Sequence, residues 1–486
     1  MERRLSRSAH DGGSEAFEGL LGGNGSSSSQ EGKKGSHFRE VEASEGTRVM
    51  KRRFLRRLAI ALVAYGSSSP RAEYLVARAG ERLHEKLNIS IFYSAILLVF
   101  PGSGDPCRDE TYLDRVEVDT DVAKLQQVDE IANGVGLPST PLSDAYRRLS
   151  SVARKESPFG SWSTLLGYTI TAPTAALLFF DGGIWDAAFS LLLGFVVGLL
   201  SLYSSSLTAL GDILEFVSAI FVSFTARLIS EYFQHLGVCF FSMALSGLVW
   251  LLPGEGLTVG VSEVVEASLV TGASRIIRAL VASLQLGFGL VVGEKIMFWG
   301  KSSVKEQCKP VQLSQWWDVL WLLAFSSAVN VLLRARPWQW PGMIVTAAAG
   351  VLINDLTESF GKEISAVLAS FAIELTANLY SDFSRDIPLS MTLSGIQVLL
   401  PGGLGVQGVE AMMKHDVLSG VNFVIAMINI SLSITLGLLL AKVFVGDTLF
   451  SAFRSSRKTL ASSLEDDERW EESKENEEAE DEQIAI

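Results

Sequence analysis

The sequence has 486 residues, of which 48% are hydrophobic and 20% charged, and its formal net charge is −13. Its mean hydropathy is positive, which favours a membrane protein over a soluble chain of this length. Most of the negative charge lies in residues 465–482, which include twelve acidic and two basic residues. A nucleic-acid-binding domain would concentrate Lys and Arg. The only basic cluster, at 51–57, is interpreted as a solvated helix face or a contact with anionic lipid headgroups.

Neither metal chemistry nor catalysis is indicated by the sequence. The spacings of Cys107, Cys239 and Cys308 predict neither a disulfide framework nor a zinc site. The five histidines lie far apart, and none belongs to an HExxH motif. The GxGD motif of aspartyl intramembrane proteases is replaced by Ala-Leu-Gly-Asp at 209–212, and His235 has no serine partner of the kind that serine intramembrane proteases use. The sequence therefore predicts no metal, no cofactor and no enzyme activity.

The N-terminal part of the chain is predicted to be a disordered head followed by a soluble domain. Residues 1–50 are too rich in Ser, Gly and charge to form a core, and no apolar stretch behind Arg3 and Arg4 suggests a signal peptide. Residues 51–158 are predicted to form a cytosolic α+β domain. Its expected elements are helices and strands in the order helix 54–65, helix 71–87, strand 89–100, strand 112–118, helix 121–133 and helix 141–155.

After Pro158 the chain becomes hydrophobic in blocks long enough to cross the ~30 Å hydrocarbon core, which takes ~20 helical residues. Ten transmembrane helices are predicted, at 162–180, 184–204, 210–231, 236–252, 272–295, 317–334, 341–357, 363–382, 390–411 and 420–445. Pro401 and several glycines interrupt the ninth. Such breaks are tolerated at membrane depth only where protein or a water-filled cavity receives the freed backbone groups.

An internal repeat divides these helices into two sets of five. The motif Leu-Leu-Pro-Gly at 251–254 recurs at 399–402, an offset of 148 that also carries Gly260, Gly272 and Gly289 onto glycines. With an offset of 147, SAIFVSF at 218–224 matches SAVLASF at 365–371. An odd number of spans in each repeat places the second upside down, which is the inverted-repeat plan of many secondary transporters.

The predicted domains are therefore a disordered head, a soluble domain, two inverted five-helix repeats with a linker between them, and a disordered acidic tail. Their boundaries are 1–50, 51–158, 159–300, 301–316, 317–446 and 447–486. Basic residues near the span ends place both termini in the cytosol. Three lysines of the linker, Lys301, Lys305 and Lys309, are exceptions to that rule. The protein is expected in a plasma membrane or a vacuole-like membrane.

Several motifs resemble those of the threonine/serine exporter family, including its fungal pheromone-regulated members. They are AYG at 64–66, SPRAEYL at 69–75, LPG at 252–254, VTGASR at 270–275, ANLYS at 377–381 and LPG at 400–402. The resemblance covers about 54–445. It implies export of threonine and serine in exchange for, or driven by, protons, with a cytosolic N-terminal domain. The implied ligands are small polar amino acids and protons, in a lipid bilayer, without nucleic acid. A homo-oligomer is one option for its assembly.

An ionisable side chain inside a span is a candidate functional group. Glu374 lies near the middle of the eighth span, and Asn378 follows one turn later, so both can face one cavity. Loss of hydration disfavours the charged carboxylate there, which suits a proton carrier. A structural ion pair with an arginine, for instance Arg227 at the matching place in the first repeat, is the alternative.

The two Pro-Gly breaks are the other candidate substrate sites. Pro253, Gly254, Pro401 and Gly402 can leave carbonyls and amides free to bind a zwitterion, or can instead allow close helix packing. Charged residues near the breaks are further candidates, namely Glu263, Glu266 and Arg275. A secondary transporter is the predicted function. A membrane scaffold or signalling protein, whose soluble head and acidic tail recruit partners, is the alternative.

Overall fold

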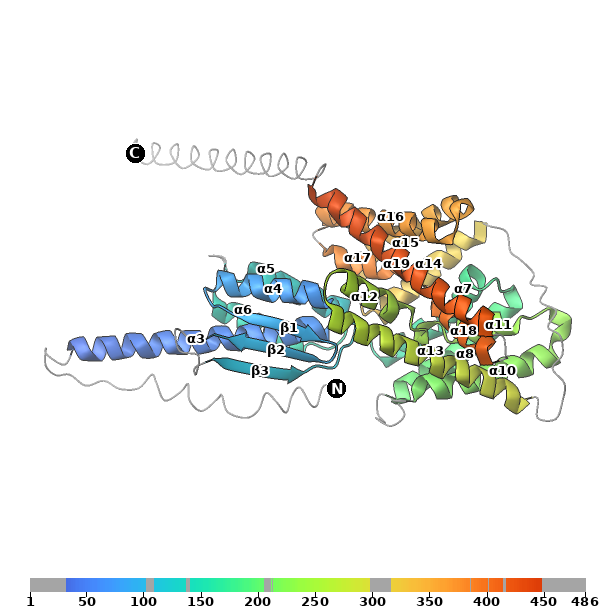
Figure 1. Ribbon diagram of the computed structural model, residues 1–486, viewed down its shortest axis with the longest axis horizontal. Coiled ribbons are helices and arrows are strands. Elements are labelled where there is room, and N and C mark those ends of the chain that lie inside the picture. The colour runs from blue at the N-terminus through green and yellow to red at the C-terminus, as the bar shows by residue number, and fades with distance from the viewer. Residues whose placement is uncertain are drawn as a thin grey trace, which may run out of the picture. The chain divides into compact units, whose positions relative to one another are not determined.

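A computed structural model describes residues 32–101, 109–136, 140–204, 211, 213–297, 316–384, 386–400, 402–413 and 417–447 (Figure 1). The predicted linker at 301–316 lies outside these ranges except for its last residue, and so does the acidic tail after residue 447. The chain divides into two compact units, Met1–Arg53 and Phe54–Ile486. The second unit contains both the soluble domain and the membrane helices.

Helix α3 spans Gly32–Ala64 and so begins well before the predicted boundary at residue 51. Its C-terminal part buries Phe54, Leu58 and Leu62 completely, and this packing fixes a helical nucleus. Extending an existing helix adds one hydrogen bond for each residue fixed, so the polar segment ahead of it can continue the helix. The predicted disordered head is therefore helical from Gly32 onward, and its residues 1–31 lie outside the described ranges.

The soluble domain combines a three-stranded antiparallel sheet with helices. The strands are β1 (Asn88–Phe92), β2 (Ala95–Phe100) and β3 (Glu110–Arg115), in the order β1-β2-β3. The helices are α4 (Ser69–Arg82), α5 (Val122–Gly134) and α6 (Leu142–Arg154). The strand predicted at 89–100 is a hairpin, because Phe92 pairs with Ala95 across a tight turn. Alternate residues of β2 are fully buried and pack against α3 and α4, which gives the domain its core.

The rest of the described chain is helical. Its elements are α7 (Ser161–Phe179), α8 (Ile184–Ser204), α10 (Leu214–Tyr232), α11 (Phe240–Gly247), η3 (Val249–Leu251), α12 (Gly254–Val265), α13 (Leu269–Met297), α14 (Trp316–Leu332), α15 (Trp340–Thr357), α16 (Lys362–Ser384), α17 (Pro388–Ile396), α18 (Gly402–Met413) and α19 (Val417–Asp447). Each predicted span contains one or more of these helices. The protein is therefore a polytopic helical membrane protein.

Five helical segments in the described ranges are long and apolar enough to cross a membrane by themselves, at Ile184–Ser204, Leu269–Met297, Pro337–Phe360, Lys362–Ser384 and Gly420–Val445. A sixth arises if the bent pair Phe240–Gly247 and Val249–Val265 counts as one broken span. The two parts of that pair meet at 59°. Helix α12 within it was not predicted, because a glycine-rich segment of only twelve residues is shorter than a membrane span.

The helices pack in corresponding pairs in the two repeats. Helix α13 packs along α10 and α12, and α19 packs along α16 and α18. Contacts of α13 with α18, and of α12 with α19, join the repeats. Figure 1 shows α13 and α19 as two long helices that cross the same bundle.

Candidate functional site

The two Leu-Leu-Pro-Gly breaks meet each other inside the helical bundle. A methyl group on Gly254 would lie 2.9 Å from the amide nitrogen of Gly402, and one on Gly402 would lie 3.1 Å from that of Gly254. The contact is reciprocal, because Leu400 approaches Gly254 as Leu252 approaches Gly402. Only glycine lets two backbones come this close. Helices α12 and α18 therefore both begin at the point where the breaks touch.

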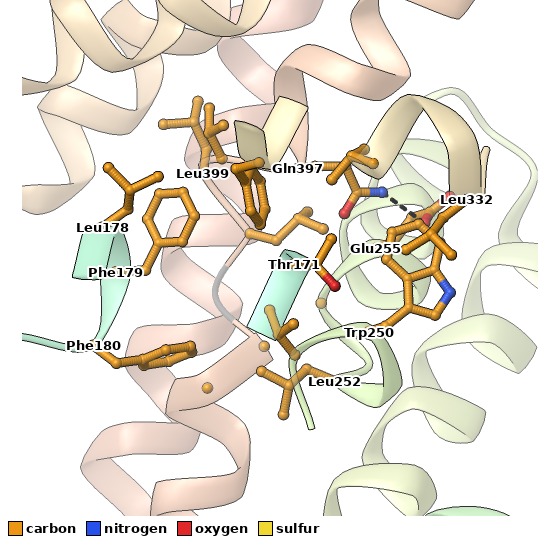
Figure 2. A pocket seen from close by; sticks show the side chains of 18 of the residues that line it. Thr171, Leu178, Phe179, Phe180, Trp250, Leu252, Glu255, Leu332, Gln397 and Leu399 are labelled. Carbon is orange, nitrogen blue, oxygen red and sulfur yellow. Dashed lines mark hydrogen bonds between the residues drawn. The ribbon is translucent and has the colours of Figure 1, made fainter. Parts of the chain in front are cut away.

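A cavity of about 770 Å³ surrounds this meeting point. It is lined by α7, the breaks before α12 and α18, and parts of α8, α14, α15, α16 and α19. Figure 2 shows Phe179, the last residue of α7, and Phe180, directly after it, on one side and Trp250 and Glu255 on another, with Leu399 and Gln397 beside the second break. Its walls combine apolar and aromatic side chains with many polar and charged groups.

The principal polar contact in the cavity joins the two repeats. Gln397, at the end of α17, donates a hydrogen bond of 2.9 Å from Nε2 to Oε2 of Glu255, in the first turn of α12 (Figure 2). Glu255 was not predicted as a site residue, although its place directly after the Pro-Gly break is the signal that could have identified it. The pair places a carboxylate and an amide beside the N-termini of two helices.

Further polar groups line other parts of the cavity. The hydroxyl groups of Tyr168 and Ser201 lie 3.0 Å apart, and both side chains line the cavity. Asp119 of the soluble domain also lines it and accepts a hydrogen bond of 2.6 Å from Arg334, in the connection after α14. Elsewhere the lining includes Asn354, Glu358, Lys362 and Ser365, near the junction of α15 and α16. The soluble domain thus contributes Asp119, one member of a charged pair, to the cavity wall.

Glu374 is buried in α16 but does not line the cavity. Its carboxylate accepts hydrogen bonds from Asn378 (3.1 Å) and from Thr392 of α17 (2.7 Å). Asn378 contacts Glu374 as their spacing predicts, but neither residue lines the cavity, so the expectation that both face one cavity is not met. The alternative pairing with Arg227 is wrong, because that guanidinium lies 3.3 Å from Glu294 of α13 and over the Phe240 ring. In the described part of the chain, Glu374 has only neutral hydrogen-bond donors.

The charged candidates near the first break do not line the cavity, and two of them, Glu263 and Arg275, attach the soluble domain. Glu263, which is fully buried, accepts hydrogen bonds from the amide and hydroxyl of Ser69 at the start of α4, and pairs with Arg275 at 2.8 Å. Glu266 pairs with Lys442 of α19 at 3.2 Å.

Among the predicted site residues, Gly254 and Gly402 line the cavity. Pro253 is the N-cap residue of α12 and adjoins the cavity without lining it, and Pro401 falls outside the described residues.

Two further observations concern cysteine and metal chemistry. Cys239, between α10 and α11, is disulfide-bonded, a pairing that the cysteine spacings did not predict. Two cysteines far apart in sequence can meet only through the fold, which spacing does not reveal. Within the described ranges, no group of three or more His, Cys, Asp or Glu side chains is placed to hold a metal ion.

Comparison with known proteins identifies one family. The profile of the family described as "Putative threonine/serine exporter" matches residues 53–297 and 306–445. An uncharacterised protein of Schizosaccharomyces pombe is 27% identical over 368 residues, covering 74% of this chain and 48% of the relative. Pheromone-regulated membrane protein 10 of Debaryomyces hansenii is 26% identical over 422 residues, with 81% and 42% covered. Its Candida albicans namesake is 27% identical over 382 residues, with 77% and 34% covered.

The chain spans about half the length, or less, of these curated relatives. No solved structure matches it.

Proposed function

The chain belongs to the threonine/serine exporter family, and from that membership and the cavity we propose that it is a secondary transporter which exchanges small polar amino acids, such as threonine and serine, for protons. The observation that carries the proposal is the cavity at the meeting point of two broken helices. Transporters commonly place their substrate site near the bilayer midplane, at broken helices where two repeats meet.

The cavity has the chemistry to bind a zwitterion. Helices α12 and α18 begin at its centre with Gly254 and Gly402, and the positive ends of helix dipoles attract a carboxylate. The carboxylate of Glu255 can accept hydrogen bonds from the substrate ammonium group in place of the Gln397 amide. Tyr168 and Ser201 offer hydroxyl groups to a polar side chain. Binding would thus use both repeats at once.

The contacts of the soluble domain support an inverted arrangement of ten crossings. In the first repeat the domain contacts the α12–α13 connection, where Thr271 donates to the Ile91 carbonyl. In the second repeat it contacts the α14–α15 and α16–α17 connections, through Arg334 and Asp386. If each broken or continuous helix crosses the membrane once, α12–α13 lies opposite α7–α8 and α10–α11. The first and third connections of the two repeats then lie on opposite sides, which is the inverted plan.

Two features support a cytosolic position for the soluble domain. Basic residues flank the membrane helices on its side, as positive-inside topology requires. The disulfide of Cys239 belongs to the α10–α11 connection, which this arrangement places on the opposite side. Disulfides persist in oxidising compartments and are rare in the cytosol. Both tails of the chain would then be cytosolic.

Glu374 is the proposed proton carrier. It is a buried carboxyl of α16, and in the described part of the chain its oxygens accept hydrogen bonds from the neutral side chains of Asn378 and Thr392. It belongs to α16, which lines the cavity with other residues, but does not line the cavity itself, so substrate and proton need not share a site. Its protonation would instead be linked to how α16 packs on α17.

Uptake of labelled threonine or serine into proteoliposomes tests the proposal. Wild-type protein should accumulate substrate when a pH gradient is imposed, and Glu255→Gln should lose uptake and exchange together. Glu374→Gln should keep substrate exchange while losing the response to the gradient. Glu215→Gln, a carboxylate of α10 outside the cavity lining, is the matched control and should behave as wild type. Absence of uptake by folded wild-type protein would contradict transport and favour the scaffold hypothesis.

A further inference from the structure

The long helices of the two repeats pack on their neighbours in different registers. In the first repeat Gly289 of α13 lies against Phe216 of α10. The repeat offsets carry Gly289 onto Gly437 and Phe216 onto Glu363. Gly437 of α19, however, lies against Val367 of α16, which is four residues beyond Glu363. Since 3.6 residues make one turn, α16 is displaced along α19 by one helical turn relative to the first repeat.

The other side of each long helix shows no such displacement. Gly260 of α12 faces the Gly272 carbonyl of α13, and the equivalent Gly408 of α18 faces the Gly420 carbonyl of α19. Both contacts obey the same offset of 148. The difference is therefore confined to the α10–α13 and α16–α19 contacts.

Equivalent positions on these helices carry opposite charges in the two repeats. The offsets carry Arg227 onto Glu374, and Glu294 onto Lys442. The first pair is formed, at 3.3 Å. The second pair is not formed, because Lys442 binds Glu266 at 3.2 Å and Glu374 accepts hydrogen bonds from neutral side chains.

In the present register Leu438 of α19 takes the place of Glu294, because Gly437 meets Ser370 as Gly293 meets Ser223. Leu438 also packs against the hydrophobic cluster that contains Ile373 and Ala377. Leu438 precedes Lys442 by four residues, or one turn. A slide of one turn, about 5.4 Å, is thus the movement that would replace Leu438 by Lys442 beside Glu374.

We propose that Lys442 is the second partner of Glu374, and that a one-turn slide of α16 along α19 forms their ion pair while the reverse slide of α10 along α13 separates Arg227 from Glu294. The proposal rests on the transport function above. In an inverted-repeat transporter, access alternates by movement of one repeat against the other, so each repeat can adopt the register that the other shows. One-turn slides are a known form of switching between packed elements.

The slide gives Glu374 two environments with different charge preferences. In the present register it accepts hydrogen bonds from the neutral side chains of Asn378 and Thr392. Beside Lys442 it has an opposite charge, which favours the anion. Proton release to water would accompany formation of the ion pair, and proton uptake would accompany its separation.

Among the charged residues on the described helices next to α16, Lys442 is the partner that a one-turn slide can bring to Glu374. Helix α17 carries no charged residue, α15 carries Asp355, and the turn before α16 carries Glu358. These two acids lie at the end of α16 that begins with Lys362, near Ser365, which binds Asn354. Asp382 of α16 lies two turns beyond Glu374, and α19 ends with Asp447.

Cross-linking in membranes tests the slide without any transport measurement. Phe216 and Phe288 stack in the first repeat with ring centres 5.6 Å apart, and their equivalents are Glu363 and Leu436. Glu363→Cys/Leu436→Cys should be captured by a short thiol reagent only after a slide. The control, Phe371→Cys/Phe444→Cys, replaces two rings now 5.9 Å apart and reports the present register.

Capture of both pairs supports two registers. Capture of the Phe371/Phe444 pair alone, under every substrate and pH gradient, overturns the slide.

Transport by charge variants tests the role of Lys442. Lys442→Gln should move the pH dependence of uptake to higher values by about 1–3 units, the usual effect of losing an adjacent opposite charge. Glu266→Gln removes the partner that Lys442 has in the present register and so favours the ion pair with Glu374. It should therefore move the pH dependence in the opposite direction, to lower values.

Glu374→Lys/Lys442→Glu should recover part of the exchange activity that either single variant loses. Equal pH shifts in Lys442→Gln and Glu266→Gln, or no recovery in the double variant, would overturn the ion pair. Failure of wild-type uptake would instead concern the proposed function, while the cross-links still decide the slide.

Discussion

The meeting of the two breaks predicts that Gly254 cannot carry a side chain. A β-carbon there would lie 2.9 Å from the Gly402 amide nitrogen and 3.0 Å from the β-carbon of Leu400. The first of these neighbours is a backbone atom, so the clash can be relieved only by shifting the backbone of one of the two breaks. Overpacking of this kind costs about 1–3 kcal/mol. Gly254→Ala should therefore destabilise the protein by that amount.

Gly256 offers a matched control two residues later in the same helix. A β-carbon on Gly256 would meet only the β-carbon of Ala279, at 4.0 Å, which is ordinary van der Waals contact. Alanine is favoured over glycine inside helices by about 1 kcal/mol, so Gly256→Ala should stabilise the protein slightly. The two substitutions add the same methyl group and should change the free energy of unfolding in opposite directions.

Unfolding of both variants in mixed detergent micelles, followed by circular dichroism, measures the difference. The expected separation between them is on the order of 2–4 kcal/mol. Gly254→Ala should also lose substrate uptake, because displaced breaks change the cavity. A Gly254→Ala protein as stable as Gly256→Ala would show that the breaks do not touch, and would remove the geometric basis of the site.

Three other outcomes are expected. Burial raises the pKa of Asp121, although the hydrogen bond from the Lys124 amide opposes that rise. The contribution of Asp121 to stability is therefore greatest below the ordinary aspartate pKa of about 4. It falls as pH rises through the raised pKa. Asp121→Asn, which can still cap α5, should flatten that slope in thermal unfolding measured against pH. Asp119→Asn should cost less than about 1 kcal/mol of unfolding free energy, since the ion pair with Arg334 is over a third exposed. In denatured, unreduced protein, thiol titration should find one free thiol in wild type and two in Cys239→Ser.

The sequence predicted a polytopic helical membrane protein because the signal of a hydrophobic helix is local, although among the described residues only five or six segments, not ten, are long and apolar enough to span a membrane. Hydrophobic blocks of about twenty residues have few alternatives to a membrane helix, and the two Leu-Leu-Pro-Gly motifs marked breaks that the structure contains. The repeat at an offset of 148 also anticipated that α12 and α18 would correspond. The soluble domain was harder. The apolar run at 89–100 reads as one strand, and only the pairing of Phe92 with Ala95 divides it.

The cavity could not be predicted because its residues meet only through the fold. Glu255 and Gln397 are far apart in sequence and belong to different repeats, so no spacing rule connects them. The sequence predicts that Glu374 is buried because it is a carboxyl in an apolar segment, and the structure buries it. The same signal could not separate Glu263, which anchors Ser69 of the soluble domain, from a residue that faces a substrate.

The soluble domain supplies to the second repeat a link that the first repeat makes by itself. In the first repeat Asp186 accepts hydrogen bonds from the Gly183 amide (2.8 Å) and the Cys239 amide (2.7 Å), which ties the α7–α8 connection to α10–α11. The equivalent connections of the second repeat are tied by Gln126 of α5, which binds both Gln339 and Asp386. The corresponding pair of connections is thus held together in each repeat, by Asp186 in the first and by Gln126 of the soluble domain in the second. Detaching the soluble domain would therefore leave two connections of the second repeat without this tie, so the domain is a structural part of the membrane unit.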